Sequence, residues 1–284
     1  MRLATVKQAG RAVVGVIEGD DWISLGGDLR SALEQGLDLH AAAAIARQTG
    51  SRHSLGGLRL APPVTDPVTV VCLGLNYRDH AKEGGRAEPE YPWFFLRSAR
   101  SLMGGFEPAI LPKVSTQFDF EAELAVVIAR DVPRHVRRED ALRYVFGYSC
   151  FNDLSVRDYQ RRTPQWTIGK NFDATGAFGP VLVTADELPP GAAGLRIRGR
   201  LNGETVQDGN TSDMIFPVDR TIAILAECMT LAAGDVIVMG TPSGVGQSRR
   251  PPLWLRQGDR FEVEIEGIGV LTNYIHGEMP AFVP

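Results

Sequence analysis

The chain has 284 residues, of which 44% are hydrophobic and 23% charged, so it suits one large soluble domain or a small domain beside a larger one. Its formal net charge is −4, and both signs are spread along the chain. This distribution argues against nucleic-acid or membrane partners, and no apolar run approaches the ~20 residues of a membrane helix. The three sparse cysteines and the absence of a signal-peptide core predict a reduced, cytoplasmic protein.

Residues 1–66 are expected to form a small N-terminal α/β domain. The valine-rich stretch 13–17 predicts a strand, and the alanine-rich stretch 29–48 has helical spacing. Residues 67–284 then form a larger second domain. The prolines that mark the boundary are Pro62, Pro63 and Pro67.

The second domain is expected to contain more strands than helices. Strands are predicted at 68–73, 124–128, 145–151, 181–183 and 235–239, and helices at 76–83, 138–143, 154–162 and 218–231. Asn202-Gly203 lies at the middle of one predicted hairpin, and 261–274 forms another. Hairpins favour mixed or antiparallel pairing over a doubly wound parallel sheet. We therefore expect an α+β, β-rich fold with a mixed, rolled β-sheet.

Two glutamates stand at the start of the most apolar strand. Glu121 and Glu123 are two residues apart, so on a strand they share a face, with Cα atoms roughly 6.5 Å apart. Like charges in a partly dry place are costly unless a positive charge holds them, and a hard divalent cation would do so. A solvated acidic strand edge is the alternative, and both interpretations remain open.

Asp153 supplies a candidate third oxygen donor after another predicted strand. Its alternative role is to cap the helix predicted at 154–162. Together with Glu121 and Glu123 it makes a plausible site for Mg²⁺, Mn²⁺ or Ca²⁺, with positions left for a ligand. Asp119 shares the strand face, but a place in a loop or at the rim is preferred for it.

His80 and Glu83 are three residues apart on a predicted helix, so their side chains can touch. A glutamate that orients an imidazole makes a general base near neutral pH. A surface histidine beside a surface acid is the alternative.

Several further residues are candidates for binding an anionic substrate. Lys170 stands in a segment with few other charges, and a buried lysine requires an anion. Arg157 and Gln160 follow Asp153 by four and seven positions, near one helical face. The glycine-rich stretch that begins with Gly240 and Thr241 fails the dinucleotide and P-loop patterns, but its amides can hold a carboxylate. The alternative for Lys170, Arg157 and Gln160 is that they are solvated residues that cover the surface. The alternative for the glycine-rich stretch is a turn that the fold requires.

Taken together, these motifs resemble the fumarylacetoacetate hydrolase family over roughly residues 68–275. The motifs, in order, are Gly74-Leu75-Asn76-Tyr77-Arg78-Asp79-His80, Asp119-Phe120-Glu121-Ala122-Glu123-Leu124, Asn152-Asp153-Leu154-Ser155-Val156-Arg157-Asp158-Tyr159-Gln160, Gly169-Lys170 and Gly240-Thr241-Pro242-Ser243-Gly244. The resemblance implies a rolled β-rich catalytic domain, usually a homodimer, and Mg²⁺ or Mn²⁺ held by Glu121, Glu123 and Asp153. It assigns the proton or water to His80 with Glu83, support of negative charge to Lys170, and substrate contacts to Arg157, Gln160 and the turn at Gly240 and Thr241.

The family's substrates are 2-oxo and 2,4-dioxo acids. The first hypothesis is therefore a metal-dependent hydrolase that cleaves a carbon–carbon bond in an acylpyruvate or fumarylpyruvate, giving pyruvate and a carboxylic acid. The alternative is an isomerase, tautomerase or decarboxylase of a 2-oxo acid, such as oxaloacetate or a hydroxymuconate-type diacid. A third hypothesis is a silent, structural metal-binding protein.

The chain departs from the family pattern at two places expected near the entrance of the site. Arg97 stands where many members carry lysine, and a histidine common near Gly104-Gly105 is missing. Both departures bear on the substrate more than on the metal. The loops at 84–91 and 249–253 are expected to set specificity for the acyl chain.

Overall fold

The computed structural model describes residues 1–279. Its helices are α1 (Leu29–Glu34), α2 (Leu39–Thr49), α3 (Arg78–Glu83), α4 (Arg138–Ala141), α5 (Arg157–Gln160), α6 (Thr167–Lys170) and α7 (Val218–Cys228). Its strands are β1 (Arg2–Gln8), β2 (Arg11–Glu18), β3 (Asp21–Ser24), β4 (Arg52–Ser54), β5 (Leu60–Ala61), β6 (Val70–Gly74), β7 (Trp93–Arg97), β8 (Leu102–Met103), β9 (Ala109–Leu111), β10 (Phe118–Asp119), β11 (Ala122–Ile128), β12 (Val145–Asp153), β13 (Ser155–Val156), β14 (Gly176–Thr184), β15 (Arg196–Leu201), β16 (Glu204–Asn210), β17 (Val236–Val238), β18 (Arg260–Ile265) and β19 (Gly269–Gly277).

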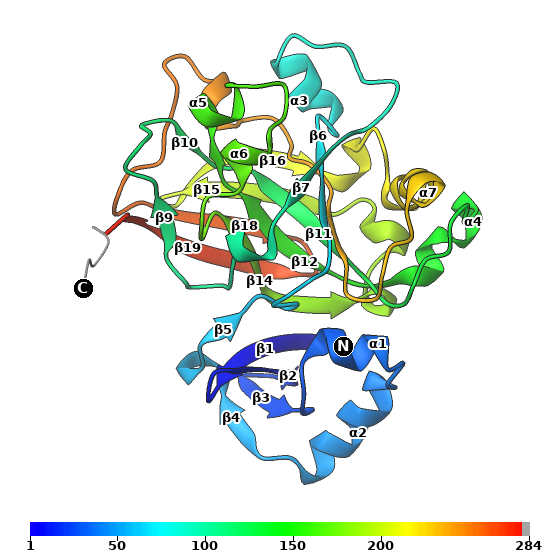
Figure 1. Cartoon of the computed structure of the whole chain (residues 1–284). Coiled ribbons are helices and arrows are strands. Elements are labelled where there is room, and N and C mark those ends of the chain that lie inside the picture. The colour runs from blue at the N-terminus through cyan, green and yellow to red at the C-terminus, as the bar shows by residue number, and fades with distance from the viewer. Residues whose placement is uncertain (280–284) are drawn as a thin grey trace.

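Two mixed sheets dominate the structure (Figure 1). The larger sheet has the order β4-β3-β2-β1-β14-β12-β11-β17-β6-β7, and the smaller has the order β16-β15-β18-β19-β9. Most neighbouring strands are antiparallel, but β17 runs parallel to β6 and β19 parallel to β9. Apolar side chains of both sheets share one core, in which the rings of Phe120 and Phe261 stack at 4.7 Å. The predicted β-rich fold with mixed sheets is confirmed.

The leading segment forms the small α/β unit that the sequence predicts, the blue lobe in Figure 1. Its first strand continues the large sheet, because Leu3 of β1 pairs with Leu182 of β14. The sheet therefore crosses the predicted boundary at residue 66, and the division into two domains stays a prediction. The prediction of one continuous helix at 29–48 is wrong. Gly36 has a φ of +64°, and Asp38 starts a second helix by accepting a hydrogen bond from the Ala41 amide.

The segment after β12 also differs from expectation. Asp153 is the last residue of β12 and pairs with Gly176, so it does not cap a helix. Residues 155–156 pair with β10, and only the single turn α5 is helical. Arg157 and Gln160 of this segment are buried and joined by a hydrogen bond, whereas Arg161 and Arg162 are exposed.

The hairpin predicted at Asn202-Gly203 is confirmed between β15 and β16. Both residues have positive φ, +53° and +91°, as a type I′ turn requires. Within residues 1–279, no helix is both long enough and apolar enough to cross a membrane.

Candidate active site

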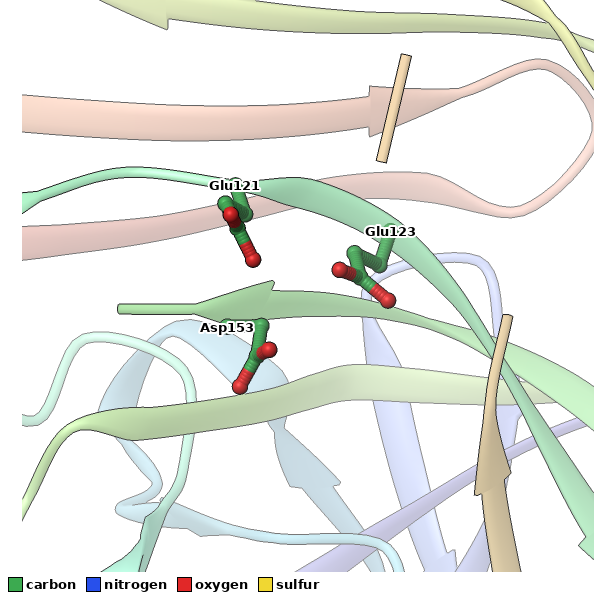
Figure 2. A group of neighbouring side chains, drawn as sticks. All are labelled: Glu121, Glu123 and Asp153. Atoms are coloured by element: carbon green, nitrogen blue, oxygen red, sulfur yellow. The ribbon is translucent and has the colours of Figure 1, made fainter. Parts of the chain in front are cut away.

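The three acidic residues predicted from the sequence converge at the ends of two neighbouring strands (Figure 2). Glu123 lies in β11 opposite Phe151 of β12, while Glu121 comes just before β11 and its carbonyl accepts the Asp153 amide at 2.9 Å. This register places one carboxylate oxygen from each residue within 4.8 Å of the others. All three side chains are buried, so a solvated acidic edge is wrong.

Buried cations lie against two of the three carboxylates. Lys170 Nζ is 2.6 Å from Glu121 Oε2 and 2.5 Å from Asp153 Oδ2. Arg157 Nη2 donates to the other oxygen of Glu121 at 2.7 Å. Burial works to raise the pKa of Glu121, but Arg157 and Lys170 outweigh it and hold that pKa well below the ordinary 4.5.

Glu123 has the opposite balance. Burial, followed by the charges of Asp153 and Glu121, raises the pKa of Glu123 well above its ordinary value, although the Gly240 amide donates to Oε2 at 2.6 Å. In addition, Asp153 Oδ1 is buried without a hydrogen-bond donor. Within residues 1–279, no lysine or arginine makes an ion pair with Glu123, and a cluster of hard oxygen atoms with such a member fits a divalent cation such as Mg²⁺ or Mn²⁺.

Arg97 lies beneath the site and not at its entrance, which corrects the sequence-based expectation. Its guanidinium is buried, and Nε is 3.3 Å from Asp153 Oδ1 without hydrogen-bond geometry. The same group donates to the carbonyls of Lys170 and Thr175. Arg97 therefore fixes the backbone that carries Lys170 and balances the charge of Asp153.

Asp119 is neither a fourth member of the acidic cluster nor a rim residue. It is buried and accepts hydrogen bonds from Arg157 Nε at 2.8 Å, Gly246 N at 2.7 Å and Gln247 N at 3.0 Å. Arg157 thereby bridges Asp119 and Glu121. This arrangement connects the segment after β17 to the acidic cluster.

The predicted contact between His80 and Glu83 is present on α3. His80 Nδ1 lies 3.3 Å from Glu83 Oε2, and the Gly244 amide donates to Oε1 of Glu83 at 3.0 Å. Burial works to raise the pKa of Glu83, but these contacts outweigh it, and the pKa is lower than the ordinary 4.5. Glu83 is therefore a carboxylate at neutral pH and can orient the imidazole.

Gln207 contributes to the site although nothing in the sequence singles it out. Its Oε1 accepts the Ala122 amide at 2.9 Å, and its Nε2 donates to Thr241 Oγ1 at 2.8 Å. Thr241 in turn donates to the Ala122 carbonyl at 2.9 Å. Gln207 comes from β16 and lies more than 80 positions after Ala122 in the sequence, so no local spacing could reveal its role.

Most of the predicted residues line one cavity of about 370 Å³. That volume lies at the small end of ligand pockets, which span about 300–1,000 Å³. The predicted residues in its wall are His80, Glu83, Glu121, Glu123, Arg157, Gln160, Lys170 and Thr241. Asp153 and Gly240 are absent from the wall. The Gly240 amide is already used by Glu123, so its predicted contact with substrate stays untested.

Known proteins resemble this chain along most of its length. It is 43% identical over 215 residues to human oxaloacetate tautomerase FAHD2A, mitochondrial, covering 75% of this chain and 68% of the relative. It is also 43% identical over 227 residues to oxaloacetate tautomerase YisK from Bacillus subtilis, covering 78% and 75%.

Solved structures share the fold. A fumarylacetoacetate hydrolase from Exiguobacterium antarcticum superposes with a TM-score of 0.85 at 35% identity, covering 98% of this chain and all of the other. A 5-carboxymethyl-2-hydroxymuconate delta-isomerase from Mycobacterium smegmatis superposes with a TM-score of 0.79 at 31% identity, covering 99% of this chain and all of the other. Maleylpyruvate hydrolase from Sphingobium sp. SYK-6, in complex with manganese(II) and pyruvate, superposes with a TM-score of 0.82 at 29% identity. The match covers 98% of this chain and all of the other.

The model of the fumarylacetoacetate hydrolase C-terminal domain matches residues 69–276, which is most of the chain. This match includes every residue of the acidic cluster and of the cavity wall named above. The chain belongs to the fumarylacetoacetate hydrolase family.

Proposed function

We propose that the protein is a metal-dependent tautomerase of 2-oxo acids, with oxaloacetate as the model substrate. The observation that carries this proposal is the shared cavity: the His80–Glu83 pair and two members of the acidic cluster, Glu121 and Glu123, line one small space. The two relatives named oxaloacetate tautomerase support the same activity. They favour the tautomerase alternative over the carbon–carbon hydrolase that the sequence placed first.

Glu121, Glu123 and Asp153 would hold the cation, Mg²⁺ or Mn²⁺. When bound, such an ion supplies Lewis-acid stabilisation of negative charge on the oxygen atoms of a keto acid. The manganese in the Sphingobium structure supports this assignment.

In the proposed reaction, His80 moves one proton between the substrate carbon beside the keto group and the solvent. Keto–enol conversion removes a proton from the carbon beside the keto group and places one on oxygen, or the reverse. Glu83 engages Nδ1, which leaves Nε2 of the imidazole for this transfer. No water attack and no bond cleavage in the carbon skeleton are needed.

The cationic side chains of the cavity would hold the substrate and its developing charge. Lys170 places an ammonium group in the wall beside Glu121, where it can stabilise an enolate. Arg157 and Gln160 are joined by a hydrogen bond of 2.9 Å and present polar atoms to the same space. Thr241 adds a hydroxyl group that Gln207 orients.

A direct test follows the loss of the enol form of oxaloacetate by ultraviolet absorbance, with Mg²⁺ or Mn²⁺ present. We expect the protein to accelerate the conversion, and a chelator to abolish the acceleration. If the protein supplied with metal converted the enol no faster than the reaction without protein, the proposal would be rejected. A structural role for the metal would be supported if no 2-oxo or 2,4-dioxo acid were converted.

Carbon–carbon hydrolysis is the second candidate function. It is favoured by the similarity to maleylpyruvate hydrolase, since His80 could activate a water molecule in place of abstracting a carbon-bound proton. Product analysis separates the candidates: two fragments indicate hydrolysis, one isomer indicates tautomerisation, and carbon dioxide indicates decarboxylation. The homodimer and the cytoplasmic location stay predictions.

A further inference from the structure

Two of the four arginines in the cavity wall make neither an ion pair nor a hydrogen bond to another side chain in the part of the chain that the structure describes. They are Arg86, in the loop after α3, and Arg250, in the segment after β17. Neither makes an ion pair within residues 1–279, whereas half of the arginines of this chain do. Unpaired cations that face one cavity indicate an anionic group of the ligand.

Two acids close to Arg86 in sequence have other partners. Glu88 follows Arg86 by two positions, but it lies 3.7 Å from Arg78. Glu83 is in the same wall and is held by His80 and the Gly244 amide. Arg86 itself lies 5.4 Å from the centre of the Trp93 ring, a contact that supports the guanidinium without neutralising it.

The position of these arginines separates them from the inner end of the cavity. Glu121, Glu123 and Lys170 are buried, while Arg86 and Arg250 are exposed and therefore belong to the mouth. Figure 1 shows the cyan loop after α3 and the orange segment after β17 at the same end of the molecule as α5 and α6. Arg161 is a third exposed arginine in this wall, but it donates to the amide oxygen atoms of Gln117 and Gln247.

We propose that Arg86 and Arg250 bind the distal carboxylate of a dicarboxylic 2-oxo acid and so select diacids over monoacids. This inference rests on the proposed function, because it assumes that the 2-oxo carboxylate end enters first, toward the acidic cluster. A guanidinium group suits the task, since it offers paired N–H donors to a planar carboxylate. The apolar side chains in the same wall, such as Leu73 and Phe95, offer the distal carboxylate no hydrogen bond.

The test measures binding with ligands that cannot tautomerise. Malate keeps both carboxylates of oxaloacetate, and 2-hydroxybutanoate replaces the distal carboxylate with a methyl group. Titration calorimetry with Mg²⁺ present would compare the parent with Arg86→Gln, Arg250→Gln and the double variant. Arg11→Gln, which removes an exposed charge on β2 outside the cavity wall, is the matched control.

We expect the parent and Arg11→Gln to prefer malate by about tenfold or more, which is the effect of losing roughly one charge-assisted contact. Each single variant should reduce this preference. In the double variant the ratio of the two affinities, malate over 2-hydroxybutanoate, should fall close to one because malate binds more weakly. Arg86→Lys and Arg250→Lys should restore part of it. An unchanged preference in the double variant, or an equal loss for both ligands, would overturn the proposal.

The same proteins distinguish this proposal from the proposed function. If the parent lacks tautomerase activity but the malate preference follows the two arginines, the distal site stands and the proposed reaction is wrong. If oxaloacetate is tautomerised and the double variant still prefers malate, the reaction stands and the arginines do not select diacids.

Discussion

His80 Nδ1 lies 3.3 Å from Glu83 Oε2, one turn along α3, and the other oxygen of Glu83 accepts the Gly244 amide at 3.0 Å. The glutamate thus holds the imidazole to a fixed point on the glycine-rich segment after β17. This contact orients the imidazole ring. The pair lines the same cavity as Glu121 and Glu123 of the acidic cluster.

Replacing His80 with glutamine should remove the proton-transfer group while keeping a polar side chain. We expect kcat for oxaloacetate tautomerisation to fall by about 10²–10⁴-fold, the usual size of a general-base contribution. His276→Gln, on the exposed face of β19, is the matched control and should retain the parent rate. Full activity of His80→Gln would show that another group moves the proton.

The lowered pKa of Glu83 gives a prediction for stability against pH. Because the folded state releases this proton more readily than the unfolded state, Glu83 stabilises the fold fully above the ordinary value of 4.5. This contribution is lost as the pH falls through the lower folded-state pKa. The free energy of unfolding in urea should therefore differ more between the parent and Glu83→Gln at pH 7 than at pH 4. A larger difference at pH 4 would contradict the assignment.

The strands and the acidic cluster could be predicted because their signals are local. A short valine-rich run predicts β11, and alternation along it places Glu121 and Glu123 on one face. The partners of these residues could not be predicted in the same way. Arg97 reaches Asp153 across the sheet, and Gln207 arrives from a hairpin distant in sequence. Such contacts depend on strand order, which hydrophobic spacing does not specify.

Gln207 should be important for stability as well as for the position of Thr241. Gln207→Leu keeps the size of the side chain but leaves the Ala122 amide without its acceptor and the Pro242 carbonyl without its donor. An unsatisfied buried group costs about 1–3 kcal/mol, so with two such groups the free energy of unfolding should fall by roughly 2–6 kcal/mol. Urea denaturation measures this change. A loss below about 0.5 kcal/mol, typical of a surface substitution, would argue against the network.

The three cysteines should differ in reactivity. Cys72 and Cys150 are buried, and burial raises the pKa of Cys150 to about 12, so it remains a thiol at neutral pH. Cys228 is exposed at the end of α7. Native protein should therefore react with a thiol reagent at one cysteine, and unfolded protein at all three. Mass spectrometry would identify the site, and rapid native labelling of Cys150 would contradict the structure.

The most direct test of the account is a calorimetric titration of metal-free protein with Mn²⁺ and with Mg²⁺. We predict one binding site per chain in the parent, unchanged in Glu204→Gln on the exposed hairpin strand β16. Glu123→Gln should weaken binding by at least about 100-fold, more than the ~10–100-fold typical of residues outside the ligand set. Equal affinity in folded Glu123→Gln, or no binding of either ion by the parent, would contradict the assignment of Glu121, Glu123 and Asp153 as metal ligands.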